Sequence, residues 1–185
     1  MKLNMGCGFN RIAGLVNVDK YPACHPDMVF DAETLPWPWE SNSVDGVLFN
    51  HSLEHMGASS SLFLSMVQEL YRVCEPNAKV RINVPHPRHD NFINDPTHVR
   101  AVTPEMMCLF DLQKNQQWVQ GGFANSPLAI YLGVDFVLES SEILLSPAYE
   151  QKLARGEISP EEIKTSLAER SNVAQEFRMV LSVRK

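Results

Sequence analysis

The sequence predicts an α/β fold built on a mostly parallel sheet, and two observations support this prediction. Short apolar runs with strand composition alternate with segments whose apolar residues recur at helical spacing. The run VDGVLF at 44–49 is mostly apolar on both faces, as expected for a buried parallel strand. With 185 residues, the chain is expected to form a single domain around one core.

The first half of the chain contains five predicted strands and one predicted helix. The strands are residues 2–5, 15–19, 27–30, 44–49 and 80–84. The helix begins near Ser59, shows helical apolar spacing, and is expected to end at Pro76. Prolines in the stretch LPWPW exclude a helix from the loop before the fourth strand.

The second half begins with a polar segment and ends in a strand. Residues 86–100, rich in His, Asp and Asn, are predicted to form an ordered loop. A helix should start at Thr103, with Pro104 in its first turn. A sixth strand is expected at 134–138. The capping box Ser159–Glu162 should open a helix to about Arg170, and clean alternation over 177–183 predicts the last strand.

The composition argues against several classes of partner. A formal net charge of −6 argues against a broad nucleic-acid-binding surface. No apolar run is long enough to span a bilayer, so no membrane partner is expected. The four cysteines form no C-x-x-C pair and no signal peptide is evident, so free thiols and a cytoplasmic location are expected. The composition leaves the oligomeric state open.

Three strand ends carry residues suited to ligand binding. In open α/β sheets, ligands bind beyond the carboxyl ends of the strands. The stretch Gly6–Cys7–Gly8 follows the first strand, and its glycines allow a ligand to approach the backbone closely. Asp19 ends the second strand and could accept hydrogen bonds from a ribose diol, and Asp31 follows the third. Taken singly, each of these could equally be a turn residue or a cap.

Taken together, these motifs resemble those of one enzyme family. The stretches LNMGCG, VNVD, DAETLPWPWESNSVDGVLFNHSLEH and ELYRVCEPNAKVRINVP are similar, in order and spacing, to the motifs of class I S-adenosylmethionine-dependent methyltransferases. The resemblance covers residues 2–85 and is weaker beyond; it is closest to abbreviated bacterial members of the type 11 kind. It implies a Rossmann-like sheet with a final antiparallel strand. It also implies methyl transfer from S-adenosylmethionine to a small-molecule or sugar-type acceptor.

The resemblance implies a division of labour along the chain. Residues 1–85 would bind the cofactor, and residues 86–185 would provide the acceptor side and the last strands. The Gly6–Gly8 stretch would lie under the methionine part, Asp19 would bind the ribose hydroxyls, and Asp31 with Ala32 would flank the adenine. The implied cofactor-binding residues are Asn4, Gly6, Cys7, Gly8, Asp19, Asp31, Ala32, Asn50 and His51.

The connection between the first two strands is unusually short. Only nine residues, 7–15 (15 − 6), lie between Gly6 and Val16. A parallel crossover that contains a helix needs about 10–12 residues or more. The first helix of the fold is therefore expected to be shortened or missing. The alternative to an enzyme is a non-catalytic domain of the same fold that has lost cofactor affinity. A dehydrogenase is disfavoured, because the third glycine of its fingerprint is replaced by Arg11.

Five of the six histidines lie in two segments, after the fourth and fifth strands. The stretch NHSLEHM contains H-x-x-E-H, the signature of inverted zinc proteases. Here the motif follows an apolar strand and is cut short by Gly57, which disfavours a protease. A hydroxyl or amine acceptor needs its proton removed, and His55, His86 and His98 are the candidates. Any of them could instead cap a turn or bind a backbone carbonyl.

The same segments predict a metal site. If residues 51–56 form a helical turn, His51 and His55 share a face with Glu54 beside them, and a third histidine could complete a divalent-metal site. The stretch also resembles E-x-x-E-H of small-RNA 3′-terminal 2′-O-methyltransferases and some quinone-pathway O-methyltransferases, which implies a metal that engages substrate hydroxyls. The predicted ligands are His51, Glu54, His55 and His98.

Overall fold

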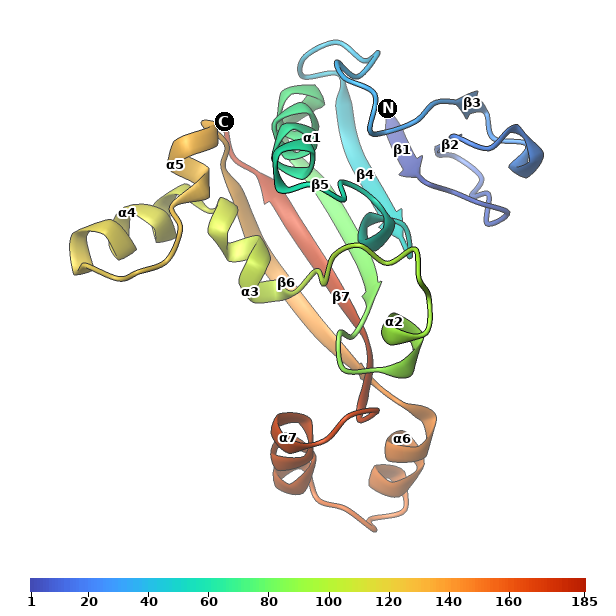
Figure 1. Ribbon diagram of the computed structural model, residues 1–185, viewed down its shortest axis with the longest axis vertical. Coiled ribbons are helices and arrows are strands. Elements are labelled where there is room, and N and C mark those ends of the chain that lie inside the picture. Colours follow the sequence, from blue (N-terminus) through green and yellow to red (C-terminus); the bar gives the residue numbers. More distant parts are fainter.

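The computed structural model describes residues 1–185 and contains one seven-stranded sheet in the order β3-β2-β1-β4-β5-β7-β6 (Figure 1). The strands are β1 Lys2–Met5, β2 Val16–Asp19, β3 Met28–Val29, β4 Val44–Asn50, β5 Cys74–Pro85, β6 Phe136–Leu145 and β7 Ala174–Val183. The α-helices are α1 Ser60–Val73, α2 Asp90–Ile93, α3 Pro104–Met107, α4 Leu112–Gly121, α5 Leu128–Leu132, α6 Pro147–Ala154 and α7 Pro160–Glu169. Short 3-10 turns lie at Pro22–Cys24, Leu53–His55 and Cys108–Phe110.

The strand directions confirm the predicted fold class. Strands β3, β2, β1, β4 and β5 pair in parallel, whereas β7 is antiparallel to both β5 and β6. Six strands therefore run one way and only the last strand in the chain runs the other way. The carboxyl ends of β1, β2 and β4 meet at one edge of the sheet, where ligands bind in such folds.

The first crossover has no helix, as its length predicted. Residues 6–15 form turns, and the links from β2 to β3 and from β3 to β4 also contain no α-helix. One face of the central strands is therefore not covered by helices, and on it Lys2, Asp45 and Arg81 are exposed and Leu48 is half-buried. The expectation that strand 44–49 is buried on both faces was wrong, because the helices that would cover its second face are missing.

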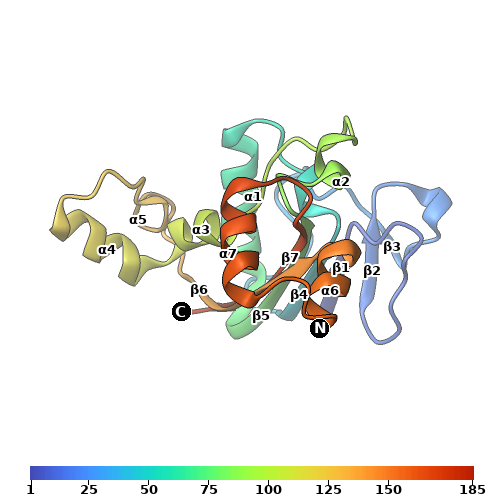
Figure 2. The same cartoon turned by 90° about the horizontal axis from the view of Figure 1, so that it is seen from below.

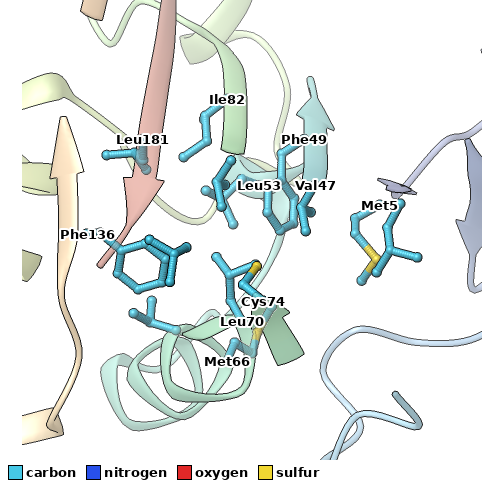
Figure 3. Packing of buried hydrophobic residues seen from close by; sticks show 14 of the residues in the cluster. Met5, Val47, Phe49, Leu53, Met66, Leu70, Cys74, Ile82, Phe136 and Leu181 are labelled. Atoms are coloured by element: carbon cyan, nitrogen blue, oxygen red, sulfur yellow. The ribbon is translucent and has the colours of Figure 1, made fainter. Parts of the chain in front are cut away.

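The hydrophobic core lies on the opposite face of the sheet. Helices α1 and α3 lie on the same side of the strands (Figure 2). In the core, Met66 and Leu70 of α1 lie with Ile82 of β5, Phe136 of β6 and Leu181 of β7 (Figure 3). Each of these five side chains is at most 5% exposed. One helix therefore supplies much of the cover for the centre of the sheet.

Several element boundaries differ from those expected. Helix α1 ends at Val73, and Pro76 lies inside β5 rather than ending the helix. Proline is tolerated there because it stands at the irregular start of the strand, where the register with β4 shifts between Val44 and Gly46. Strand β6 is longer than predicted, whereas the capping box at Ser159 is present. The loop 86–100 contains the short helix α2.

A tryptophan loop takes the place of the helix between β3 and β4. Trp37 and Trp39 are 3% and 8% exposed, and their rings meet edge to face at 5.9 Å. Arg72 of α1 donates hydrogen bonds to both tryptophan carbonyls, at 3.0 Å each. Glu69 of α1 accepts from the Trp37 N–H at 2.6 Å and from the Arg72 guanidinium at 2.8 Å. The ion pair within α1 thus holds the loop through hydrogen bonds between both of its members and the tryptophan backbone.

Replacing Glu69 with glutamine should lower the free energy of unfolding at pH 7 by about 1–3 kcal/mol, because charged hydrogen bonds are lost. Hydrogen bonding to Arg72 lowers the pKa of Glu69 below its usual value. The stabilisation is therefore complete above the unfolded-state pKa of about 4.3 and is lost as pH falls through the lower folded-state pKa. Urea unfolding at pH 7 and pH 4 measures this, with Glu40→Gln in the same loop as the exposed control. Equal losses in both variants would contradict the prediction.

None of the helices combines the length and the apolar composition needed to cross a membrane.

Candidate active site

A cavity of about 390 Å³ lies at the carboxyl ends of β1, β2 and β4. Its volume is within the range of about 300–1,000 Å³ typical of small-molecule sites. The lining comes from the last residues of β1 and β2 and from the loops that follow the first four strands, with one residue, Thr97, from the polar segment 86–100. Of the predicted cofactor-binding residues, those that line it are Gly6, Gly8, Asp19, Asp31, Ala32 and His51. Six of the nine residues predicted to bind the cofactor therefore surround one cavity.

The glycine loop after β1 has a conformation that needs glycine. Gly6 has φ +65° and Gly8 has φ +50°, both in the left-handed region. A Cβ atom on Gly6 would lie 2.6 Å from the Cβ of Ser52, which follows β4. Gly8 has open space around its Cα. Gly6 thus allows two strand ends to pack together, whereas Gly8 leaves the backbone bare toward the cavity.

Asp19 is held in place by two backbone donors. The Gly8 N–H donates to its Oδ2 and the Tyr21 N–H donates to its Oδ1, both at 2.8 Å. The side chain is largely buried, at 7% exposure for the residue, and lines the cavity. Each carboxylate oxygen has a further lone pair. This arrangement can accept hydrogen bonds from two neighbouring hydroxyls of a ligand.

An asparagine network holds the glycine loop in place of the missing helix. Asn17 Oδ1 accepts from the Asn4 side chain at 3.0 Å and from the Ile12 N–H at 2.8 Å. Asp27 Oδ2 in turn accepts from the N–H and the side chain of Asn17. Asn4 therefore does not line the cavity, although it was a predicted cofactor-binding residue. Its position behind the loop makes it a support for the residues that do.

Glu54 and His98 of the predicted metal site do not line the cavity, and neither do Cys7, Asn50 and His86. The side chains of Cys7 and Asn50 make contacts behind the cavity. The Cys7 side chain is buried, and burial raises the pKa of its thiol. Asn50 accepts a hydrogen bond from the side chain of Asn83 on β5 at 2.9 Å. Their side chains therefore belong to the support of the site rather than to its surface.

His86 lies at the end of β5, packed against β7. Its ring is tilted against Phe177 with the centroids 4.7 Å apart, and its Nδ1 accepts from the Arg88 N–H at 3.2 Å. Burial, followed by the nearby positive charge of Arg88, lowers the pKa of His86. The ring is buried and outside the cavity.

His51 is held between two carboxylates. Its backbone has φ +52°, a strained conformation for a histidine, directly after β4. Its Nε2 lies 2.8 Å from Glu176 Oε2, and its Nδ1 lies 3.7 Å from Glu54 Oε1. Interaction with Glu54, and then with Glu176, raises the pKa of His51. Glu176 is buried and also binds Arg178 at 2.6 Å, and no sequence pattern pointed to it.

Glu54, His55 and His98 come together, as the metal prediction expected. One possible ligand atom from each lies within 4.8 Å of the others. The two imidazole rings meet edge to face with their centroids 4.5 Å apart. The Glu54 carbonyl accepts from the N–H groups of Val99 and Arg100, and these bonds bring the distant loop to this corner. His55 lines the cavity, whereas Glu54 and His98 lie behind it.

Two aromatic residues of the cavity had no counterpart among the predicted residues. Phe30 lies after β3 and meets Trp39 edge to face at 5.7 Å, and Tyr21 lies after β2. Phe30 ends the strand predicted at 27–30 and Tyr21 closely follows the one predicted at 15–19, and these positions were the signal available in the sequence. They give the Asp31 side of the cavity a partly apolar wall suited to a planar ring.

Comparison with known proteins agrees with this geometry. Residues 9–82 match the family model described as a methyltransferase domain. A SAM-dependent methyltransferase from Archaeoglobus fulgidus superposes with a TM-score of 0.66 at 20% identity, over 98% of this chain and 85% of that one. One from Methanosarcina mazei gives a TM-score of 0.57 at 10% identity, over 99% and 92% of the two chains. No curated protein matches significantly.

The shared architecture extends over nearly the whole chain, whereas the sequence match covers residues 9–82. The strand order, the single reversed strand and the glycine loop with Asp19 agree with both findings. The chain therefore has the fold of class I S-adenosylmethionine-dependent methyltransferases, and its residues 9–82 are similar to a methyltransferase domain.

Proposed function

We propose that this protein is a methyltransferase that uses S-adenosylmethionine as its methyl donor. The observation that carries the proposal is the Asp19 carboxylate, which faces a cavity of about 390 Å³ and is fixed by the glycine-loop N–H. The first helix of the fold, which is missing here, is not needed to hold the glycine loop, because the asparagine network of Asn4 and Asn17 holds that loop. The residues present fit the cofactor.

Each part of the cofactor has a complementary group in the cavity. The methionine part would lie over the backbone of Gly8, which has open space around it, beside Gly6. Asp19 would accept hydrogen bonds from the two ribose hydroxyls. The adenine would lie between Asp31, Ala32 and the ring of Phe30. When bound, the cofactor supplies an electrophilic methyl group on a sulfonium, and the protein contributes chiefly by positioning.

The acceptor would enter from the side of Thr97 and His55, which line the same cavity. Among the three histidines considered for proton transfer, only His55 lines it, so acceptor contact falls to His55 rather than to His86 or His98. A small-molecule or sugar-type acceptor is proposed, bound partly by residues 86–125.

Cys7, Cys24, Cys74 and Cys108 are free thiols, which supports the cytoplasm as the compartment.

Titration calorimetry and thermal unfolding with S-adenosylmethionine and S-adenosylhomocysteine test this proposal. Ligand at one hundred times its dissociation constant should add about 2.7 kcal/mol to the free energy of unfolding. NAD serves as the control, because it shares the adenosine part but not the methionine part. The absence of binding at millimolar S-adenosylmethionine would favour the alternative, a non-catalytic domain of the same fold.

A further inference from the structure

Glu54 is a buried carboxylate without a hydrogen-bond partner. The residue is 1% exposed, and neither of its side-chain oxygens accepts a hydrogen bond from any protein group. Its backbone is pinned by the Val99 and Arg100 N–H groups, and the side chain lies within the cluster of His55 and His98. Burying a charge costs several kcal/mol unless it is paired or coordinates a metal. Such an unpaired group in a built cluster indicates a cationic partner.

The hydrogen bonds of His98 decide which of its nitrogens is free. Its Nδ1 lies 2.8 Å from the carbonyl oxygen of Phe92, which can only accept, so Nδ1 carries the proton. In the neutral ring, Nε2 then carries a lone pair. That atom lies 3.9 Å from Glu54 Oε1 and 3.8 Å from Asp95 Oδ2. Electron pairs therefore face each other unless a cation lies between them or Nε2 itself carries a proton.

His55 is held in the same tautomer by a different partner. Its Nδ1 lies 2.8 Å from Thr97 Oγ1, and the Thr97 hydroxyl donates its single proton to Asp95 Oδ1 at 2.6 Å. The hydroxyl must therefore accept from the His55 Nδ1–H, which leaves the His55 Nε2 lone pair free. A histidine that donates one ring N–H to a carbonyl or to a hydrogen-bonded oxygen and leaves the other nitrogen bare is typical of metal ligands.

We propose that Glu54, His55 and His98 bind one divalent transition-metal ion. Two imidazoles and one carboxylate favour Zn²⁺ or a similar ion over Mg²⁺ or Ca²⁺. The three ligand atoms lie within 4.8 Å of one another. Ligand atoms of tetrahedral zinc are about 3.3 Å apart, given bonds of about 2.0–2.1 Å. The distances between the three ligand atoms would therefore shorten by up to about 1.5 Å when the ion binds.

His51, the fourth predicted ligand, is assigned a different role. Its Nε2 is occupied by Glu176 at 2.8 Å, and its Nδ1 faces Glu54 at 3.7 Å. Both of its nitrogens thus point at carboxylates, so His51 neighbours the metal site without belonging to it. Three protein ligands leave positions open, as in catalytic zinc sites.

The open positions would face the cavity, because His55 and Thr97 line it. If the proposed function holds, the ion can bind an oxygen of the acceptor close to the methyl donor. Binding of the ion itself does not depend on the cofactor, so metal binding and cofactor binding can fail separately.

The test is calorimetric titration of chelator-treated protein with Zn²⁺ alone, and Co²⁺ absorption as a report on the ligand set. The expected result is one ion per chain, with affinity reduced at least about 100-fold in Glu54→Gln and His98→Ala. Thr97→Val, which removes the support of His55, should reduce it about tenfold. His89→Asn is the matched control, because His89 lies in the same segment but outside the cluster, and asparagine also caps α2.

The melting temperature of the metal-free Glu54→Gln variant gives a second test. Because it removes an unpaired buried charge, its melting temperature should equal or exceed that of the metal-free wild type, while Zn²⁺ should no longer raise it. This separates a lost ligand from a damaged fold. The proposal is overturned if no one-to-one binding is seen at micromolar zinc, or if wild type and Glu54→Gln bind zinc with equal affinity. In either case a protonated histidine would be the partner of Glu54.

Discussion

Replacing Asp19 with asparagine should weaken binding of S-adenosylmethionine at least about 100-fold, because two charged hydrogen bonds to the ribose are lost. The carboxylate is 7% exposed and is already fixed by the Gly8 and Tyr21 N–H groups, so it needs no reorganisation before it binds. Such preorganisation is why a single group can account for so much affinity. Calorimetry with S-adenosylhomocysteine, which lacks the sulfonium charge, measures the loss without a contribution from attraction between that charge and the carboxylate.

Asp31→Asn is the matched control for this change. Asp31 lies in the same cavity, and its Oδ1 accepts from the Glu33 N–H at 3.0 Å. Its loss should cost less than about tenfold, since no charged bond to the ribose is assigned to it. Equal losses in the two variants would contradict the ribose assignment and point instead to a general effect of negative charge on the cofactor. Thermal unfolding without ligand shows whether the asparagine variants keep the fold.

Replacing Gly6 with alanine should lower the free energy of unfolding by about 2–5 kcal/mol. About 1–2 kcal/mol comes from placing an L-residue at φ +65°, and the remainder comes from the contact of 2.6 Å with the Cβ of Ser52. Ser52 cannot yield easily, because it is buried and its hydroxyl donates to the Met5 carbonyl at 2.7 Å. Denaturant unfolding of the purified variant measures the loss.

Two other glycines separate the causes of that loss. Gly14 has φ +84° and open space, so Gly14→Ala should show the backbone penalty alone, about 1–2 kcal/mol. Gly8→Ala has the same open space but faces the cavity, so it should destabilise similarly and also weaken cofactor binding. If Gly6→Ala cost no more than Gly14→Ala, the close packing of the strand ends would not matter to stability.

Local patterns identified several of the residues that share the cavity. The glycine stretch, Asp19 and Asp31 were recognisable because each lies directly after a strand, and strand direction determines the edge at which it emerges. Counting the residues between Gly6 and Val16 was enough to predict the missing helix. Side-chain roles were harder, since Asn4 belongs to the same motif yet supports the loop from behind.

The sequence by itself therefore determined the fold class, the shortened first crossover and the residues at the strand ends. All of these can be recognised from neighbouring residues in the chain. Only the tertiary structure decided that Glu176, 125 residues from His51, would pair with it. It also decided that His98 would reach Glu54. The first pairing depends on β7 lying against β5, and the second depends on the loop 86–100 folding back onto the turn Leu53–His55 that follows β4. No local periodicity encodes such long-range packing.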